Sequence, residues 1–101
     1  MTQNDLDSII KALSNPARRD ILAWLKSPEI EFPEQCNNYE HGVCVGQIFE
    51  KAGLSQSTVS SHLANLQRAG LVISKRQGQW VYYQRNEECI AEFADYLKQT
   101  L

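Results

Sequence analysis

The sequence predicts one mainly α-helical domain with a β-hairpin near its C-terminal end, an α+β fold. Apolar residues recur at helical spacing in five segments. Two short runs rich in β-branched and aromatic residues flank Gln77-Gly78-Gln79, which predicts a hairpin. The 101 residues suffice for one hydrophobic core but not for two independent ones. We therefore expect residues 1–101 to form a single domain.

Two helices are predicted at the start of the chain, over about residues 5–13 and 16–26. Between them, Asn15 is a natural N-cap, and Pro16 suits a first helical turn, where its missing N–H costs nothing. The first helix has one apolar stripe at i, i+3, i+4 and i+7, made of Leu6, Ile9, Ile10 and Leu13.

Residues 27–44 predict a loop or insertion. This segment has two prolines, four acidic residues and no basic one, and its hydrophobic periodicity is poor. Loops of this length in small domains are often functional.

A helix-turn-helix is predicted over residues 45–70. A short helix over residues 45–52 ends at Gly53, which suits the left-handed position after a helix, and Ser55 caps a second helix over residues 56–69. The second helix has a buried stripe at i, i+4 and i+7: Val59, Leu63 and Leu66. Opposite that stripe lie mainly short hydroxyls and amides.

Residues 71–85 predict a two-stranded wing, and residues 87–101 a last helix capped by Asn86. The predicted order is helix, helix, loop, helix, helix, strand, strand, helix. Two helices joined by a short glycine-containing turn and followed by a hairpin are the plan of a winged helix-turn-helix.

The charge distribution supports a DNA-binding face on this unit. The protein has a net charge of −2, yet residues 55–85 contain four bases and no acid. Such a segment suits a surface that faces phosphates, and short polar side chains on a helix can read base edges in the major groove. The predicted DNA-binding residues are Gln56, Ser57, Thr58, Ser60, Ser61, Asn65, Arg68, Lys75, Arg76 and Gln79.

The same features also allow interpretations that involve no DNA binding. The outer helix face could be a solvated surface, the basic hairpin tip a solvated turn, and the acid-free segment a chance cluster. A winged helix can also serve only as a protein-interaction or dimerisation module. Trp80, Tyr82 and Tyr83 are expected to pack on a helix rather than to stack on bases, and His62 to be a structural residue beside the core.

Three stretches resemble the ArsR-type metal- and redox-sensing repressors of bacteria. They are the opening Leu13-Ser-Asn-Pro-Ala-Arg-Arg-Asp-Ile-Leu, the stretch Gly53-Leu-Ser-Gln-Ser-Thr-Val-Ser-Ser-His-Leu, and Leu66-Gln-Arg-Ala-Gly-Leu-Val leading into the wing. The resemblance implies a homodimeric repressor that binds a palindromic operator on double-stranded DNA and releases it when an inducer arrives. It places base contacts at Gln56, Ser57, Ser60 and Ser61, and it implies no required cofactor.

A dimer is also expected on physical grounds. The first and last helices both carry apolar stripes, and a small domain has little interior in which to bury both. The alternative is that both stripes pack within one monomer. The predicted interface residues are Leu6, Ile9, Ile10, Leu13, Ile90, Phe93 and Leu97.

The inducer site is less well defined. The family's Cys-Val-Cys run is incomplete here, because Gly46 stands where the second thiol would be. The weak metal or metalloid candidates are Cys36, His41 and Cys44. Cys36 and Cys44 could instead form a disulfide or trap an electrophile, since a helix N-terminus at Cys44 favours a thiolate. An inert buried thiol, or an organic ligand bound between helices, are further alternatives, and Cys89 is expected to be a packed residue.

Several classes of protein are not expected. The sequence has no Gly-rich phosphate loop and no nucleophile elbow, so no catalytic residues and no enzymatic activity are predicted. An odd number of cysteines argues for the cytosol rather than a secreted disulfide scaffold. No apolar run is long enough to predict a membrane span.

Overall fold

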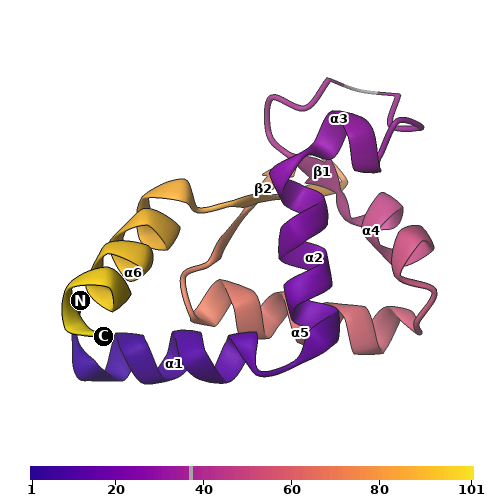
Figure 1. Cartoon of the computed structure of the whole chain (residues 1–101). Coiled ribbons are helices and arrows are strands. Elements are labelled where there is room, and N and C mark those ends of the chain that lie inside the picture. Colours follow the sequence, from indigo (N-terminus) through magenta and orange to yellow (C-terminus); the bar gives the residue numbers. More distant parts are fainter. Residues whose placement is uncertain (37) are drawn as a thin grey trace.

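A computed structural model describes residues 1–36 and 38–101 of the chain, and Figure 1 shows how its elements are arranged. Along the chain they are α1 (Gln3–Leu13), α2 (Pro16–Lys26), α3 (Pro28–Glu31), β1 (Val43–Cys44), α4 (Val45–Ala52), α5 (Gln56–Arg68), β2 (Val72–Gln77), β3 (Trp80–Arg85) and α6 (Glu87–Thr100). The mainly helical fold with a β-hairpin wing is confirmed. No described helix is both long and apolar enough to cross a membrane.

Local capping fixes where the helices begin. Asn15, Ser55 and Asn86 cap α2, α5 and α6 as predicted, each through a side-chain oxygen that accepts a backbone N–H. Helix α1 begins at Gln3, two residues before the predicted start, because Thr2 and Asp5 form a reciprocal capping box with two bonds of 3.1 Å. These hydrogen bonds from Thr2 lower the pKa of the Asp5 carboxyl.

The predicted loop over residues 27–44 was only partly right. It contains the one-turn helix α3 and the two-residue strand β1, which pairs antiparallel with β3 and gives a three-stranded sheet in the order β1-β3-β2. Both elements depend on buried neighbours, since Phe32 and Val43 are 3% and 0% exposed. Elements this short carry no detectable periodicity, and only tertiary packing reveals them.

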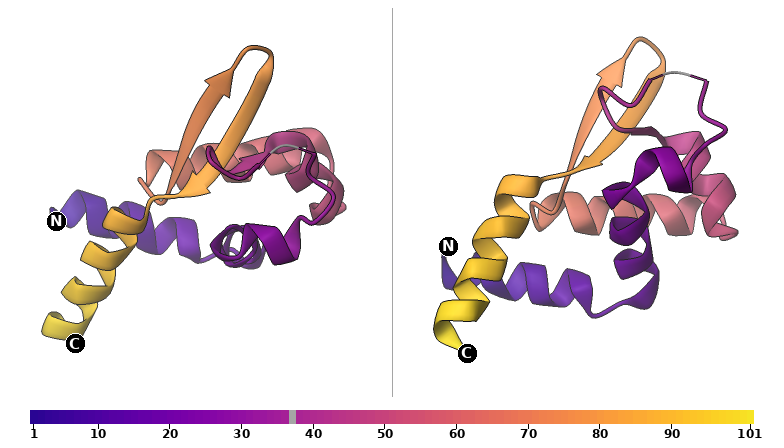
Figure 2. Two further views of the ribbon diagram at one scale, coloured as in Figure 1. Left: turned by 90° about the horizontal axis from the view of Figure 1, so that it is seen from above. Right: turned by 45° about the horizontal axis from the view of Figure 1, so that its top comes forward.

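The core lies between the helix-turn-helix, α2 and the sheet. Val59, Leu63 and Leu66 of α5 are fully buried, as their spacing predicts, and pack with Ile21 of α2 and Ile48 of α4. Gly53 ends α4 in the left-handed conformation expected of it, with φ 65°. From this core the β2–β3 hairpin projects as a wing beside α5 (Figure 2).

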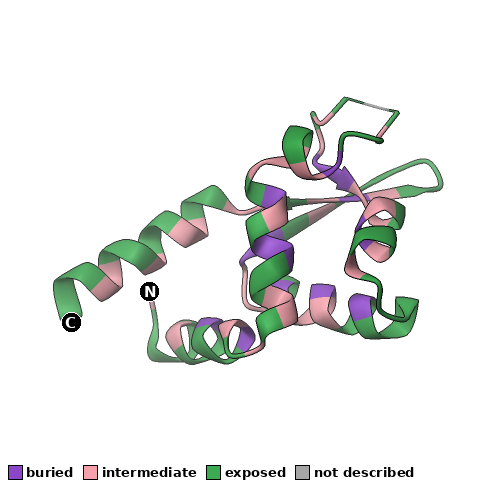
Figure 3. Cartoon of the chain, turned by 45° about the vertical axis from the view of Figure 1, so that its right-hand side comes forward, coloured by how far each residue is buried: buried purple, intermediate pink, exposed green. Residues whose placement is uncertain are grey.

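The two terminal helices differ from each other in burial. Helix α6 contains no buried residue, and Figure 3 shows it extending away from the core. Ile9 of α1, predicted in the dimer stripe, is only 1% exposed within the single chain, whereas its neighbour Ile10 is 50% exposed. The assignment of Ile9 to the interface was therefore wrong, because α1 turns this side chain into the core of its own chain.

Candidate nucleic-acid interface

The outer face of α5 consists of exposed, short polar side chains. The exposed residues are Gln56, Ser57, Thr58, Ser60 and Ser61, with Arg68 at the end of the helix. Asn65 is half-buried, and its side-chain amide donates to the Ser61 carbonyl oxygen at 3.1 Å. The helix thus presents hydroxyl and amide groups to solvent along its length while its apolar stripe holds it to the core.

Hydrogen bonds at the start of α5 divide these residues into two groups. The hydroxyl of Thr58 lies 2.7 Å from that of Ser55, and the hydroxyl of Ser57 lies 3.3 Å from the same atom. Within the described part of the chain, the side chains of Gln56, Ser60 and Ser61 make no hydrogen bond to protein. These three side chains are therefore the most available to an external donor or acceptor.

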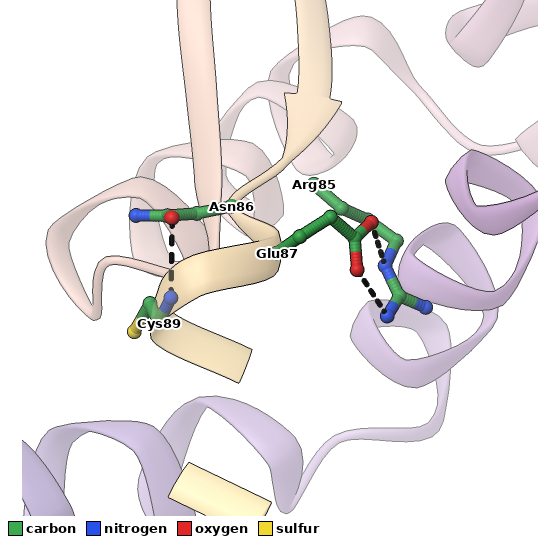
Figure 4. Close-up of polar contacts among 4 residues, drawn as sticks. All are labelled: Arg85, Asn86, Glu87 and Cys89. Atoms are coloured by element: carbon green, nitrogen blue, oxygen red, sulfur yellow. Dashed lines mark hydrogen bonds and ion pairs between the residues drawn. The ribbon is translucent and has the colours of Figure 1, made fainter. Parts of the chain in front are cut away.

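The wing adds positive charge beside this face. Lys75, Arg76 and Gln79 are exposed, and within residues 1–36 and 38–101 neither base takes part in an ion pair. Arg85 differs, because its guanidinium binds both carboxylate oxygens of Glu87 at 2.9 and 3.0 Å (Figure 4). The charge of Arg85 is thus neutralised where the wing joins α6. The other three basic residues of the acid-free segment, Arg68, Lys75 and Arg76, remain available to an anion.

The aromatic residues of the wing have separate environments. Tyr82 is buried at 5% exposure and Tyr83 is half-buried, so both pack as expected, and burial raises the pKa of the Tyr83 hydroxyl. Trp80 is 52% exposed. This exposure contradicts the expectation that Trp80 packs on a helix. An aromatic residue in a strand usually predicts packing, but only the tertiary structure shows whether another element covers the ring.

Arg18 has a positioning role that sequence reasoning missed. Its Nε donates to the carbonyl oxygen of Ala12 at 2.7 Å, and its Nη1 lies 3.5 Å from Nδ1 of His62. Arg18 therefore links the end of α1 to the middle of α5. His62 is half-buried and has the structural role expected of it, beside the core and in contact with Arg18.

The three cysteines are free thiols in different places. Cys36 and Cys44 line one hollow of about 310 Å³, between the segment after α3, the start of α4 and the wing. Cys89 lies half-buried in the first turn of α6, where burial and the carboxylates of Glu92 and Asp5 raise the pKa of its thiol. Cys89 is therefore the packed residue that was expected, in a setting that disfavours a thiolate.

The predicted metal candidates are not assembled into a site. Among the described residues no group of three or more His, Cys, Asp or Glu side chains could hold a metal ion. The ring of His41 instead lies edge-on to Tyr82 at 6.2 Å, and it lines a different hollow from the two thiols. The weak grouping of Cys36, His41 and Cys44 as metal ligands is thus corrected.

Comparison with known proteins identifies the same helix-turn-helix segment. The family model described as "Bacterial regulatory protein, arsR family" matches residues 42–74, from β1 into β2. The chain is similar to the HTH-type transcriptional regulator YbzH of Bacillus subtilis, with 47% identity over 92 residues that cover 89% of this chain and 92% of that protein. It is also similar to an arsenical resistance operon repressor of Staphylococcus xylosus, with 32% identity over 101 residues that cover 100% of this chain and 81% of that protein.

Solved structures agree with this assignment. The chain is similar to HlyU from Vibrio cholerae, with 28% identity, a TM-score of 0.65 and coverage of 99% of this chain and 98% of that one. An ArsR-family regulator, RHA00566, shares the fold with a TM-score of 0.75 at 17% identity, covering 98% and 89% of the two chains. These relatives are transcriptional regulators rather than enzymes. The chain therefore belongs to the ArsR family of winged helix-turn-helix, DNA-binding transcriptional regulators.

Proposed function

We propose that the protein is a homodimeric repressor that reads a palindromic operator with the outer face of α5 and is released by a thiol-reactive inducer. The observation that carries the proposal is the burial pattern of α5. Three apolar residues of this helix are at most 1% exposed, whereas five short polar residues are exposed. The centre of a protein-binding interface is usually more apolar and poorer in serine than this helix face.

The dimensions of α5 and of its side chains suit a DNA groove. A major groove is roughly 12 Å wide and admits one α-helix, and serine, glutamine and asparagine side chains can bond to base edges there. Lys75 and Arg76 on the wing would then lie against flanking phosphates. Direct readout on α5 and charge neutralisation on the wing are therefore separable functions.

Dimerisation is supported by the apolar surface that α1 and α6 leave uncovered. Ile10 is 50% exposed, and Phe93 and Leu97 on α6 are only half-buried in the single chain. Leu6, Leu13 and Ile90 are also half-buried and would border the interface. A two-fold pairing of these helices would place two α5 helices about one DNA turn apart, roughly 34 Å.

Replacing Ser57 and Ser61 by Ala is expected to lower discrimination between operator and random DNA. Each lost base contact costs about 1–3 kcal/mol, while alanine keeps the helix intact. Competition binding with operator and scrambled duplexes measures this difference. Equal loss on both duplexes would place the readout elsewhere.

Arg76→Ala is expected to weaken binding to operator and random DNA alike. One phosphate contact fewer reduces the slope of log affinity against log salt by about one unit. A salt titration of the variant on both duplexes measures it. An unchanged slope would show that the wing does not contact phosphate.

An inducer acting on Cys44 is supported by the placement of this residue at the end of β1 and the N-cap position of α4, in a hollow shared with Cys36. Relatives named as arsenical resistance repressors make a thiol-binding metalloid one candidate inducer. Cys44→Ser is expected to bind operator normally and to keep it when an oxidant or a trivalent arsenical is added. Normal release of the variant in a mobility-shift titration would remove thiol sensing at Cys44.

A further inference from the structure

The hollow that contains Cys36 and Cys44 also has an aromatic wall. It is formed where the segment after α3, the start of α4 and the beginning of β3 meet. Its lining residues are Glu34, Gln35, Cys36, Cys44, Gly46, Gln47, Trp80 and Tyr82. A volume of about 310 Å³ lies at the lower end of the range of small-molecule pockets, roughly 300–1,000 Å³, and suits a molecule of one or two rings.

Hydrogen bonds hold the two thiol-bearing segments together. The side-chain oxygen of Gln35 accepts the backbone N–H of Cys44 at 2.9 Å. The side-chain nitrogen of Gln35 donates to the carbonyl oxygens of Asn38 and Gly42 at 3.1 and 3.2 Å. Because Cys36 is next to Gln35 in the chain, these bonds keep both cysteines at one hollow.

The aromatic and charged groups define which molecule fits. Trp80 and Tyr82 are two residues apart on β3, so their side chains lie on the same face of the strand. The indole of Trp80 is 52% exposed and offers a ring face for stacking. Glu34 in the wall disfavours an anion. The fitting ligand is therefore planar, aromatic and not anionic, which includes neutral ring compounds.

We propose that this hollow captures planar aromatic electrophiles of the quinone class, which stack on Trp80 and become covalently bound to Cys44. This inference rests on the proposed function only where it concerns DNA release. The Cys44 sulfur forms a C–S bond to a ring carbon, and the electron pair of the ring double bond moves to a carbonyl oxygen. The thiol proton neutralises that oxygen, and the proton of the attacked carbon moves to the second oxygen.

The product is a hydroquinone thioether that contains every atom of the two reactants. The addition is redox-neutral overall, because the two carbonyl groups become hydroxyl groups while the attacked ring carbon exchanges hydrogen for sulfur, and the sulfur stays at the oxidation level of a thiol. The capture therefore requires no further oxidant or reductant. A thiol is the only kind of nucleophile in the wall that reacts this way at neutral pH.

The register of the sheet connects the hollow to the wing. Within the β2–β3 ladder, Tyr82 pairs with Lys75 and Trp80 pairs with Gln77, while Tyr82 also pairs with Cys44 of β1. Arg76 lies between the two β2 partners. A bulky adduct that displaces Trp80 and Tyr82 therefore moves the strand to which the basic wing residues are hydrogen-bonded, and it weakens their contacts to phosphate.

The chemical test treats the reduced protein with less than one equivalent of 1,4-naphthoquinone, followed by intact-mass and peptide analysis. The expected result is one adduct, on Cys44, with quenched tryptophan emission. Cys44→Ser loses both signals, and Cys89→Ser, the matched control, keeps both. An adduct that forms mainly on Cys36 or Cys89 would overturn the assignment.

Trp80→Leu tests the stacking step separately. Its rate with naphthoquinone is expected to fall by about threefold to tenfold, the range that one aromatic pair provides. Its rate with iodoacetamide, which has no ring, is expected to stay unchanged. Equal slowing with both reagents would mean that Trp80 only shapes the hollow, and it would overturn the stacking argument.

A third experiment measures DNA binding and compares operator affinity before and after adduct formation. A decrease of about 5- to 150-fold, the usual range of coupling between two sites, is expected for the wild-type protein and not for Cys44→Ser. Unchanged affinity of the verified adduct would refute the coupling to the wing. If the unmodified protein fails to bind operator, the proposed function fails, and the mass and fluorescence results still decide the quinone site.

Discussion

Replacing Ile10 by Asp is expected to separate the dimer into folded monomers and to lower operator affinity by about 10²–10⁴-fold, the gain that linking two binding units usually provides. Ile10 is half exposed in the single chain, so its replacement removes little from the monomer core. In the proposed interface the same carboxylate would be buried without a partner, which is strongly unfavourable. Light scattering gives the mass of the particle, circular dichroism its helix content, and fluorescence anisotropy its operator affinity.

Ile30→Asp is the matched control for this experiment. Ile30 is 77% exposed and belongs to α3, which Figure 1 shows away from α1 and α6. The same chemical change there is expected to leave both the mass of the particle and its operator affinity unchanged. A dimer that survives Ile10→Asp with full affinity would show that another face holds the two copies together.

Gly42→Ala is expected to lower the free energy of unfolding by about 3 kcal/mol, through a left-handed backbone and an overfilled site. Gly42 has φ 99° and immediately precedes β1. A Cβ there would collide with the carbonyl oxygen of Tyr83 and lie 2.7 Å from its carbonyl carbon. Because the obstacle is the backbone of β3, no side-chain rotation relieves it. For a domain of this size we expect a decrease in Tm of roughly 10–20 °C in thermal unfolding.

Gly46→Ala provides the opposite expectation in the same region. A Cβ at Gly46, in the first turn of α4, meets no atom within 4 Å. Alanine is a better helix former than glycine, so this variant is expected to be as stable as the wild type or up to about 1 kcal/mol more stable. If Gly42→Ala and Gly46→Ala unfold at the same temperature, the close packing of residue 42 on β3 is not what holds this edge of the sheet.

Much of the helical framework could be predicted because its signals are local. The Asn15, Ser55 and Asn86 caps and the i, i+4, i+7 stripe of Val59, Leu63 and Leu66 act within a few residues of chain. Their physics is the same in any surrounding structure. The same locality explains why most of the exposed face of α5 could be predicted, with the half-buried Asn65 as the exception. Once the buried stripe of a helix is known, its geometry sets the opposite face.

Other features depend on neighbours that are distant in sequence. Ile9 and Ile10 are adjacent and equally apolar, yet one is core and the other surface, because the position of α1 against α2 and α5 decides between them. Arg85 sits in an acid-free segment, but Glu87 removes it from the DNA-facing charge. The metal grouping was wrong for the same reason, since nearness in sequence does not bring His41 and the two thiols to one point.

By itself the sequence determined the helices of the winged helix-turn-helix, its hairpin and the polar face of α5, because caps, turns and periodicity are properties of short stretches of chain. Only the tertiary structure decided that residues 27–44 contribute a helical turn and a third strand, that Cys36 and Cys44 share a hollow with Trp80, and that Ile10 rather than Ile9 is left uncovered. Those outcomes depend on which surfaces meet, and a surface contact between distant segments leaves no periodic trace in the residues that form it.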